Sequence, residues 1–348
     1  MASHLPPGGV TEDVSADLSL DSHDGLQRLR HARFFKPGIV YHVVCKTLQG
    51  FFLLAPDRDG ELRDLTAGVI GKAQRNWPDV RLYAAAFLSN HFHCMLEGPA
   101  AHVVPFIAFV KRELSRRWAA RIGWSGPMWG AYHTTALITP EAQARCFKYV
   151  LSQSVKENAV ANPTEWPGFH CAAALLQDRR ATGTWFNATR YGKAVHKEKA
   201  KQTPRPVNRR QFVETYEVTF AKLPGCGVLS DGDYREHVRH IIDEIVEEAR
   251  AAREGREPDG VAGVFDIGHM RRGEAPVPPW FEDRRRLIAW DSPHAPEVKA
   301  YLDEYWVFQR AFREAADRWL GGELDVSFPP GSFRPGLPRP VSQDRLAA

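Results

Sequence analysis

Residues 80–99 read VRLYAAAFLSNHFHCMLEGP, and this stretch decides how the chain is expected to fold. Two runs of strand-forming residues flank Ser89–Asn90, which predicts a tight turn between antiparallel strands. Side chains alternate along a strand, so His91 and His93 are expected on one face of the sheet and Phe92 on the other. Two imidazoles on one face can hold a metal ion, but they can equally form a polar seam, and the pair alone does not separate these interpretations.

The segments around this hairpin alternate between strand and helix patterns. Strands are predicted over 39–48 and 133–138, and helices over 61–77, 101–123 and 141–160. The order strand, helix, strand, strand, helix, strand, helix indicates an α+β fold. We expect a ferredoxin-like antiparallel sheet with helices on one face.

Composition divides the chain further. Residues 1–28 are polar and are expected to be disordered, and a basic linker or arm carries eight Lys/Arg against a single acid, Glu198. Beyond it, two long helix patterns predict a mainly helical C-terminal extension, followed by a Pro-rich tail. The predicted segments are 1–28 (disordered), 29–180 (the α+β domain), 190–212 (basic linker), 213–325 (helical extension) and 326–348 (tail).

The composition is that of a globular protein able to bury a core, with 43% hydrophobic and 25% charged residues among 348. A formal net charge of +4 permits a nucleic-acid partner without requiring one. The five cysteines form no CxxC pair, which fits free thiols in a reducing compartment. No apolar run is long enough for a membrane span or a leader, so we expect no membrane partner and a cytoplasmic location.

The predicted helix 141–160 adds two groups to the histidine pair. Tyr149 and Gln153 are four residues apart and therefore share a helix face. An amide oxygen is a hard ligand that could complete a site begun by two imidazoles, and such a mixed set suits Mg²⁺ or Mn²⁺ better than structural zinc. A phenol one turn before that ligand could attack a phosphate that the metal polarises. Taken singly, Tyr149 is as well explained by a half-buried core position and Gln153 by a surface position.

Three motifs then appear in order: SNHFHCML at 89–96, GPMWGAYH at 126–133 and KYVLSQSVKENAVANPTEWPG at 148–168. With the basic helix between the first two, this pattern resembles the REP-associated tyrosine transposases, which are single-tyrosine HUH transposases. The resemblance covers about residues 30–175. It implies that His91, His93 and Gln153 hold Mg²⁺ or Mn²⁺ and that Tyr149 is the catalytic nucleophile.

The activity that the resemblance implies is metal-dependent cleavage and strand transfer of single-stranded DNA through a 5′-phosphotyrosine, at hairpin or palindromic repeats. It also implies a cytoplasmic, nucleoid-associated enzyme, and it leaves a homodimer open. The basic helix would contact phosphates and the loop aromatics would stack on bases. The expected DNA-binding residues are Lys111, Arg112, Arg116, Arg117, Trp129 and Tyr132.

Two departures keep other functions open. The usual Asn-Pro of the tyrosine motif is Gln153–Ser154 here, and the usual pair of loop arginines is missing, with Ala131 after Gly130 in its place. These changes leave room for a domesticated, non-cleaving protein that binds DNA hairpins. A metal-dependent phosphohydrolase on small substrates is a third interpretation, and it would form no covalent tyrosyl intermediate.

Overall fold

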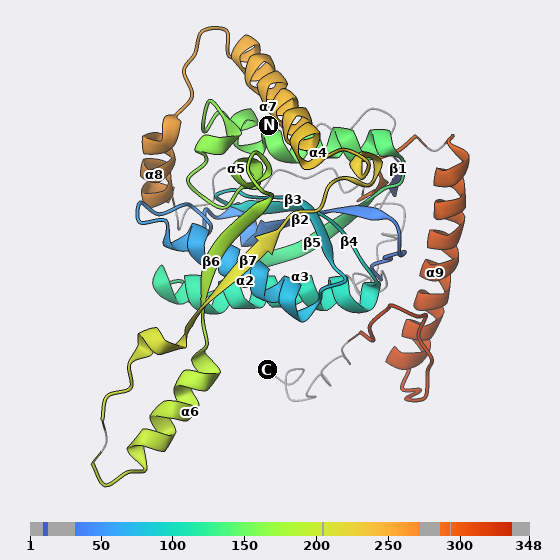
Figure 1. The fold of residues 1–348 in the computed structure, drawn as a ribbon. Coiled ribbons are helices and arrows are strands. Elements are labelled where there is room, and N and C mark those ends of the chain that lie inside the picture. Colours follow the sequence, from blue (N-terminus) through green and yellow to red (C-terminus); the bar gives the residue numbers. More distant parts are fainter. Residues whose placement is uncertain (1–9, 13–31, 204, 272–285, 293, 336–348) are drawn as a thin grey trace, which may run out of the picture.

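The computed structural model describes residues 10–12, 32–203, 205–271, 286–292 and 294–335 (Figure 1). The predicted disorder of residues 1–28 therefore lies outside the described residues except at 10–12, which form a short strand. Residues 326–335 of the predicted tail contain no helix or strand, and the rest of the tail is outside the described residues.

Six strands form the main sheet, in the order β1-β8-β5-β2-β4-β3. The central strand β2 pairs antiparallel with both β4 and β5, and β3 pairs antiparallel with β4 across the predicted Ser89–Asn90 turn. The α+β, ferredoxin-like prediction is thus confirmed. The strands are β1 (Val10–Glu12), β2 (Val40–Thr47), β3 (Arg81–Phe87), β4 (His91–Glu97), β5 (Trp129–Leu137) and β8 (Arg286–Ala289).

One strand begins earlier than predicted. The sequence predicted a strand over 133–138, whereas β5 begins at Trp129. Its ladder with β2 continues past Tyr132 opposite Cys45 to Trp129 opposite Thr47, because the neighbouring strand offers backbone partners that a loop would lack.

Helices cover both faces of the sheet (Figure 1). The two crossover helices α2 (Glu61–Asn76) and α3 (Ala100–Leu114, continued by a π-helical turn at Ser115–Ala119) lie on one face, as predicted. Helix α4 (Pro140–Lys156) lies on the other face, with α7 (Asp231–Arg253) beyond it. The prediction of helices on one face was therefore incomplete, because α4, which carries Tyr149, packs its buried side on the opposite face of the sheet.

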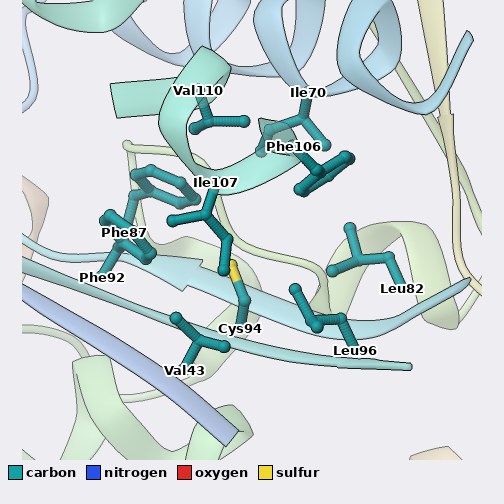
Figure 2. Close-up of a pocket in the computed structure, with 10 residues that line it drawn as sticks. All are labelled: Val43, Ile70, Leu82, Phe87, Phe92, Cys94, Leu96, Phe106, Ile107 and Val110. Carbon is teal, nitrogen blue, oxygen red and sulfur yellow. The ribbon is translucent and has the colours of Figure 1, made fainter. Parts of the chain in front are cut away.

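A small cavity between the sheet and the crossover helices is lined by apolar side chains alone (Figure 2). Phe92 and Cys94 of β4 point into it, which places the alternate residues His91 and His93 on the opposite face. The side chains that meet there are Val43, Ile70, Leu82, Phe87, Phe92, Cys94, Leu96, Phe106, Ile107 and Val110.

The C-terminal region is mainly helical, as predicted, but it is not a separate extension. It contains α8 (Gly260–Arg271) and α9 (Pro296–Leu320), yet its strand β8 joins the main sheet between β5 and β1. Helix α9 also packs on the N-terminal side of the domain, where the ring of Phe34 lies 5.0 Å from that of Phe308. A short apolar strand such as 286–289 carries too little pattern to be recognised from its own residues.

The predicted basic linker is part of a folded arm. Strand β7 (Val213–Thr219), in a region expected to be helical, pairs with β6 (Arg180–Phe186) along the whole length of both strands. Helix α6 (Ala188–Lys199) follows β6 and stands at the far end of this ribbon, well outside the body of the molecule (Figure 1). We call residues 180–219 the arm; only residue 204 of it lies outside the described residues.

Glycines fix the arm to helix α2. A Cβ on Gly183 would come within 2.2 Å of the carbonyl oxygen of Asp64, and one on Gly68 within 2.0 Å of the carbonyl oxygen of Thr184. Gln74 adds two hydrogen bonds to the backbone of Thr219, at 2.9 and 3.0 Å. The ribbon therefore lies on α2 backbone against backbone, which sets the direction in which the arm projects.

A search of the described helices for a span that could cross a membrane finds none.

We expect Gly183→Ala to lower the free energy of unfolding by about 1–3 kcal/mol, because the new methyl group must displace the backbone of α2. Gly192→Ala is the matched control: Gly192 lies within α6 with open space around its Cα, so the same change should stabilise by about 0.5–1 kcal/mol. Urea denaturation of both variants measures the difference. Equal effects of the two substitutions would contradict a close backbone contact at Gly183.

Candidate functional site

The histidine face of the sheet meets one face of α4. Tyr149 of α4 lies edge-on to His93, with ring centres 5.6 Å apart, and the rings of His91 and His93 are 4.8 Å apart. A third imidazole, His42 of β2, lies 5.8 Å from the Tyr149 ring. The structure thus brings together the predicted histidines and the predicted nucleophile.

The position of His91 is fixed by the turn before it. The Asn90 side-chain amide nitrogen donates to the carbonyl oxygen of Gly50 at 3.2 Å, so its oxygen is the atom that faces His91 Nδ1 at 2.7 Å. His91 Nδ1 must then carry the proton and donate it, which leaves the lone pair on Nε2. This is the tautomer that a metal-binding histidine needs when it binds through Nε2.

His93 is held in a similar way by another histidine. His93 Nδ1 and His42 Nε2 are 2.9 Å apart, and both side chains are buried. His93 Nε2 is also buried, yet no hydrogen-bond partner within the described residues reaches it. A buried ring nitrogen without a partner is costly, and a bound cation would satisfy it.

Burial keeps these imidazoles neutral. It lowers the pKa of His42 to about 3 and that of His91 to about 4, and it lowers the pKa of His93 well below its usual value. For His91 the positive charge of Lys46, directly opposite on β2, acts in the same direction. Neutral imidazoles keep their lone pairs, so the ligand atoms are available at neutral pH.

Gln153 lies between His91 and Tyr149. Its amide nitrogen donates to the backbone oxygen of Tyr149 at 2.9 Å, which leaves the amide oxygen free to accept or to coordinate. Hydrogen bonding with the Gln153 side chain opposes the effect of burial on both neighbours, because it raises the pKa of His91 and lowers that of Tyr149. The Gln153 side chain is 2% exposed, so it is no ordinary surface glutamine.

The phenol of Tyr149 is half-buried among aromatic and basic groups. Burial raises its pKa, and the nearby thiol of Cys146 adds to this. The ring of Trp290, from the end of β8, lies 5.3 Å away, and the ammonium of Lys156 lies 5.1 Å from the ring centre. Tyr149 is therefore protonated at rest beside a positive charge that would stabilise a phenolate.

These residues fit a divalent metal ion, although not in the form of a structural zinc site. Across the residues that the structure describes, no three His, Cys, Asp or Glu side chains gather to hold a metal. The candidate set is two imidazole nitrogens and one amide oxygen, which leaves positions open for water or a phosphate. Such a metal, bound by His91, His93 and Gln153, would act as a Lewis acid on a phosphate oxygen.

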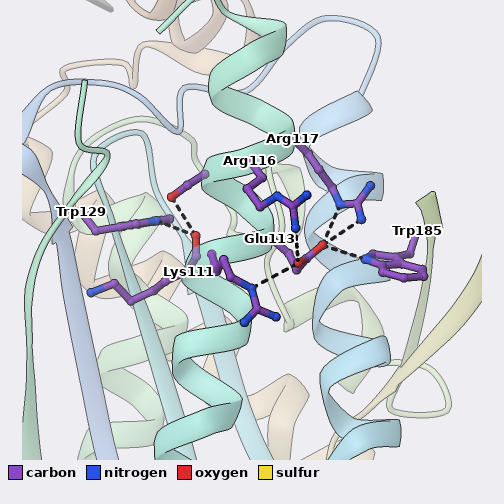
Figure 3. Close-up of polar contacts among 8 residues, drawn as sticks. Lys111, Glu113, Arg116, Arg117, Trp129 and Trp185 are labelled. Carbon is purple, nitrogen blue, oxygen red and sulfur yellow. Dashed lines mark hydrogen bonds and ion pairs between the residues drawn. The ribbon is translucent and has the colours of Figure 1, made fainter. Parts of the chain in front are cut away.

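The basic residues expected to bind DNA lie on the other face of the sheet, around one buried acid (Figure 3). Arg117 donates to Glu113 through two nitrogens, at 2.8 and 3.1 Å. Arg112 and Arg116 approach the same carboxylate at 3.4 and 3.8 Å, but their own side chains are 59% and 67% exposed. Burial alone would raise the pKa of Glu113, but the hydrogen bond and charge of Arg117 hold it below its usual value.

The two loop aromatics and Lys111 make internal contacts. Trp129 Nε1 donates to the backbone oxygen of Lys111 at 2.9 Å, and Lys111 Nζ donates to the backbone oxygen of Gly130 at 3.0 Å. The ring of Tyr132 is covered by the guanidinium of Arg33, 3.7 Å from its centre. A role of these residues in base stacking stays a prediction.

The candidate metal ligand His91 and the exposed basic residues nevertheless share one end of the sheet. Strands β4 and β5 both run antiparallel to β2, so α3, which connects them, returns to the end where both begin. His91 and Trp129 are the first residues of these strands. The exposed Arg112 and Arg116 therefore stand at the same end of the sheet as His91, across its thickness.

Two contributors to the site were not found from the sequence. His42 could have been, because a histidine in the buried strand 40–47 is unusual and shares its face with Lys46. Trp290 could not, since it is 141 positions from Tyr149 and nothing near it in the sequence marks it as part of a site.

Comparison with known proteins gives limited likeness. No family model matches the chain, and no curated protein matches it. Among solved structures, a REP-associated tyrosine transposase bound to a REP hairpin is 17% identical, with a TM-score of 0.30, over 40% of this chain and 80% of that one. A protein of Deinococcus radiodurans R1 described as a candidate transposase is 19% identical, with a TM-score of 0.25, over 35% of this chain and 96% of that one. Both scores are low, so the function is argued below from the chain's own residues.

We expect His42→Phe to weaken Mn²⁺ binding about 10- to 100-fold, because His93 Nδ1 loses the partner that orients its ring. His42→Gln, which keeps a hydrogen-bonding group, should recover part of the loss. Isothermal titration of the metal-free protein with MnCl₂ measures the affinity, and thermal unfolding checks the fold. Unchanged Mn²⁺ affinity in a folded His42→Phe protein would remove His93, or its orientation by His42, from the metal site.

Proposed function

We propose that the chain cleaves single-stranded DNA and transfers the cut strand, with Tyr149 as nucleophile and Mg²⁺ or Mn²⁺ held by His91, His93 and Gln153. The observation that carries this proposal is the edge-on contact of the Tyr149 ring with the neutral imidazole of His93, whose buried Nε2 has no hydrogen-bond partner within the described residues. The residues that meet are those that the transposase-like motifs single out, although they come from β4 and α4, more than 50 positions apart. A core tyrosine needs no such neighbours.

The proposed reaction is an exchange of phosphodiesters. The Tyr149 oxygen forms a bond to phosphorus while the bond from phosphorus to the 3′ oxygen breaks. The phenol gives up its proton and the departing oxygen gains one, so the products are a 5′-phosphotyrosine and a 3′-hydroxyl. A second 3′-hydroxyl can reverse the exchange and join a new strand without a nucleoside triphosphate.

The protein's own groups account for two requirements of this step. Gln153 and the backbone around it hold Tyr149 beside the histidines, so the nucleophile is already positioned. The ammonium of Lys156 stabilises the negative charge that develops on the phenol oxygen as its proton leaves. The substrate that the motifs imply is a hairpin or palindromic repeat with a single-stranded flank.

Covalent trapping tests this function. We expect a labelled single-stranded hairpin oligonucleotide, taken from the flanks of the chain's own gene, to form an adduct that survives denaturing gel electrophoresis. EDTA should prevent the adduct, and Tyr149→Phe should reduce it about 10³-fold or more, because the attacking oxygen is gone. Tyr234→Phe, which removes a buried hydroxyl from α7 outside the candidate site, should leave it intact.

The alternatives predict other results. DNA binding with no adduct under either metal would favour the non-cleaving hairpin-binding protein. Metal-dependent hydrolysis of small phosphodiesters that survives Tyr149→Phe would favour the phosphohydrolase, since that reaction needs no tyrosyl intermediate.

A further inference from the structure

The arm is the most strongly charged part of the molecule, and the candidate site on α4 does not use it. Between residues 190 and 210 there are eight basic residues and one acidic one, a formal charge of +7. The chain as a whole carries only +4, so the rest of it is slightly acidic. Lys193, Lys197 and Lys199 are exposed, and within the described part of the chain they form no salt bridge.

The arm is a preformed structure. The ring of Tyr191 contacts those of Phe186 and Phe212, at 5.4 and 5.6 Å, which fastens α6 to the end of the ribbon. The half-buried residues of α6 lie on one side of the helix and are Tyr191, Ala194, Val195 and Glu198. Arg190, Lys193 and Lys197, spaced three and four residues apart, therefore form a stripe on the exposed side, in which Arg190 also pairs with Glu214 at 2.9 Å.

The root of the arm joins the basic cluster of α3. Trp185 Nε1, on β6, donates to the buried carboxylate of Glu113 at 3.3 Å, and the guanidinium of Arg117 lies 4.9 Å from the Trp185 ring (Figure 3). The exposed guanidiniums of Arg112 and Arg116 share that carboxylate. Exposed cations thus lie on α3 and on α6, on the face of the sheet opposite Tyr149, while the ribbon carries Arg180 paired with Glu217.

The chemistry of this surface suits a phosphate backbone rather than bases. Single-stranded nucleic acid is usually bound by aromatic rings that stack on the bases. Here the rings of Trp185 and Tyr216 are covered by Lys72, at 5.3 and 5.0 Å, and those at the tip contact one another. The surface offers cations in a row, and a row of cations matches a duplex, which has one negative charge per about 1.7 Å of axis.

We propose that the arm, residues 180–219, together with Arg112 and Arg116, is a docking surface for the backbone of double-stranded DNA. The inference rests on the proposed DNA substrate and names a further part of it, a duplex stem bound away from the cleaved strand. Helix α6 alone, twelve residues long, spans about 18 Å, which corresponds to about 11 duplex charges. The arm lies outside the stretch of about 30–175 that resembles the transposase family.

Salt dependence of duplex binding tests the docking surface. The variant Lys193→Gln/Lys197→Gln/Lys199→Gln removes three cations and keeps good helix formers in α6. The matched control, Arg239→Gln/Lys299→Gln/Arg310→Gln, removes three exposed cations from α7 and α9. The probe is a blunt 20-base-pair duplex with no single-stranded flank, and its affinity is measured by fluorescence anisotropy between 50 and 200 mM NaCl.

We expect the arm variant to bind this duplex at least tenfold more weakly at 100 mM NaCl. The slope of log affinity against log salt should become shallower by about 2.7, because three phosphate contacts are lost. The control should match the unmodified protein. Equal slopes for the arm variant and the control, or no binding of the duplex by the unmodified protein, would overturn the inference.

A second measurement separates this inference from the proposed function. A single-stranded oligonucleotide too short to form a stem should give the same Tyr149 adduct with the arm variant as with the unmodified protein. If the adduct forms but the arm variant binds the duplex as well as the unmodified protein does, the docking surface is refuted and the proposed cleavage activity stands. If the arm variant binds the duplex more weakly but no substrate gives an adduct, the proposed cleavage activity is refuted and the docking surface stands.

Discussion

The buried carboxylate of Asp291 determines where α4, the helix of Tyr149 and Gln153, begins. It accepts hydrogen bonds from the backbone nitrogens of Ile138 and Thr139, at 2.8 and 3.1 Å, and from the Thr139 hydroxyl at 2.6 Å. That hydroxyl in turn caps α4 by accepting from Ala142 N at 3.2 Å. An anion at this position also stabilises the positive end of the helix dipole, and bonds to a charged group of this kind contribute about 1.5–3 kcal/mol each. The register of α4 on the sheet, and with it the position of Tyr149 and Gln153, follows from this contact.

The same contact explains why the C-terminal region belongs to the domain. Asp291 lies directly after Trp290, whose ring contacts both Tyr149 and His42. Strand β8, just before them, adds a rung next to β5, so the sheet itself holds these two residues in place. A chain ending near residue 175 would therefore contain the motif residues but lack a wall of the site and the cap of its helix.

Local periodicity was enough to predict the parts of the site that lie within single elements. His91 and His93 follow from the period of a strand, and Tyr149 and Gln153 from the period of a helix. What joins the two faces is sheet register and helix packing, and these depend on contacts between residues far apart in the chain. In the register of β2 and β4, Val44 lies opposite His93. His42 is two residues before Val44 on the same face of β2, so its ring lies diagonally beside that of His93 and can contact it. The charges of α3 could be counted from the sequence, and the spacing of Glu113 and Arg117 even predicts their pairing, but the contribution of Trp185 from the arm could not be predicted.

The main sheet separates the candidate site from the exposed basic residues, and this separation constrains how a nucleic acid could contact both. The imidazoles, Tyr149 and Gln153 are on the α4 face, whereas Arg112, Arg116 and the arm are on the face of α2 and α3. A nucleic acid that contacts both must pass the end of the sheet at which β4 and β5 begin, because the other routes cross the packed helices. Lys46 and His91, paired across β2 and β4, stand at that end and supply a positive charge next to the proposed metal ligand. A branched substrate meets this requirement better than a single strand, since its duplex can follow the cations on one face while its unpaired flank turns over the edge to Tyr149.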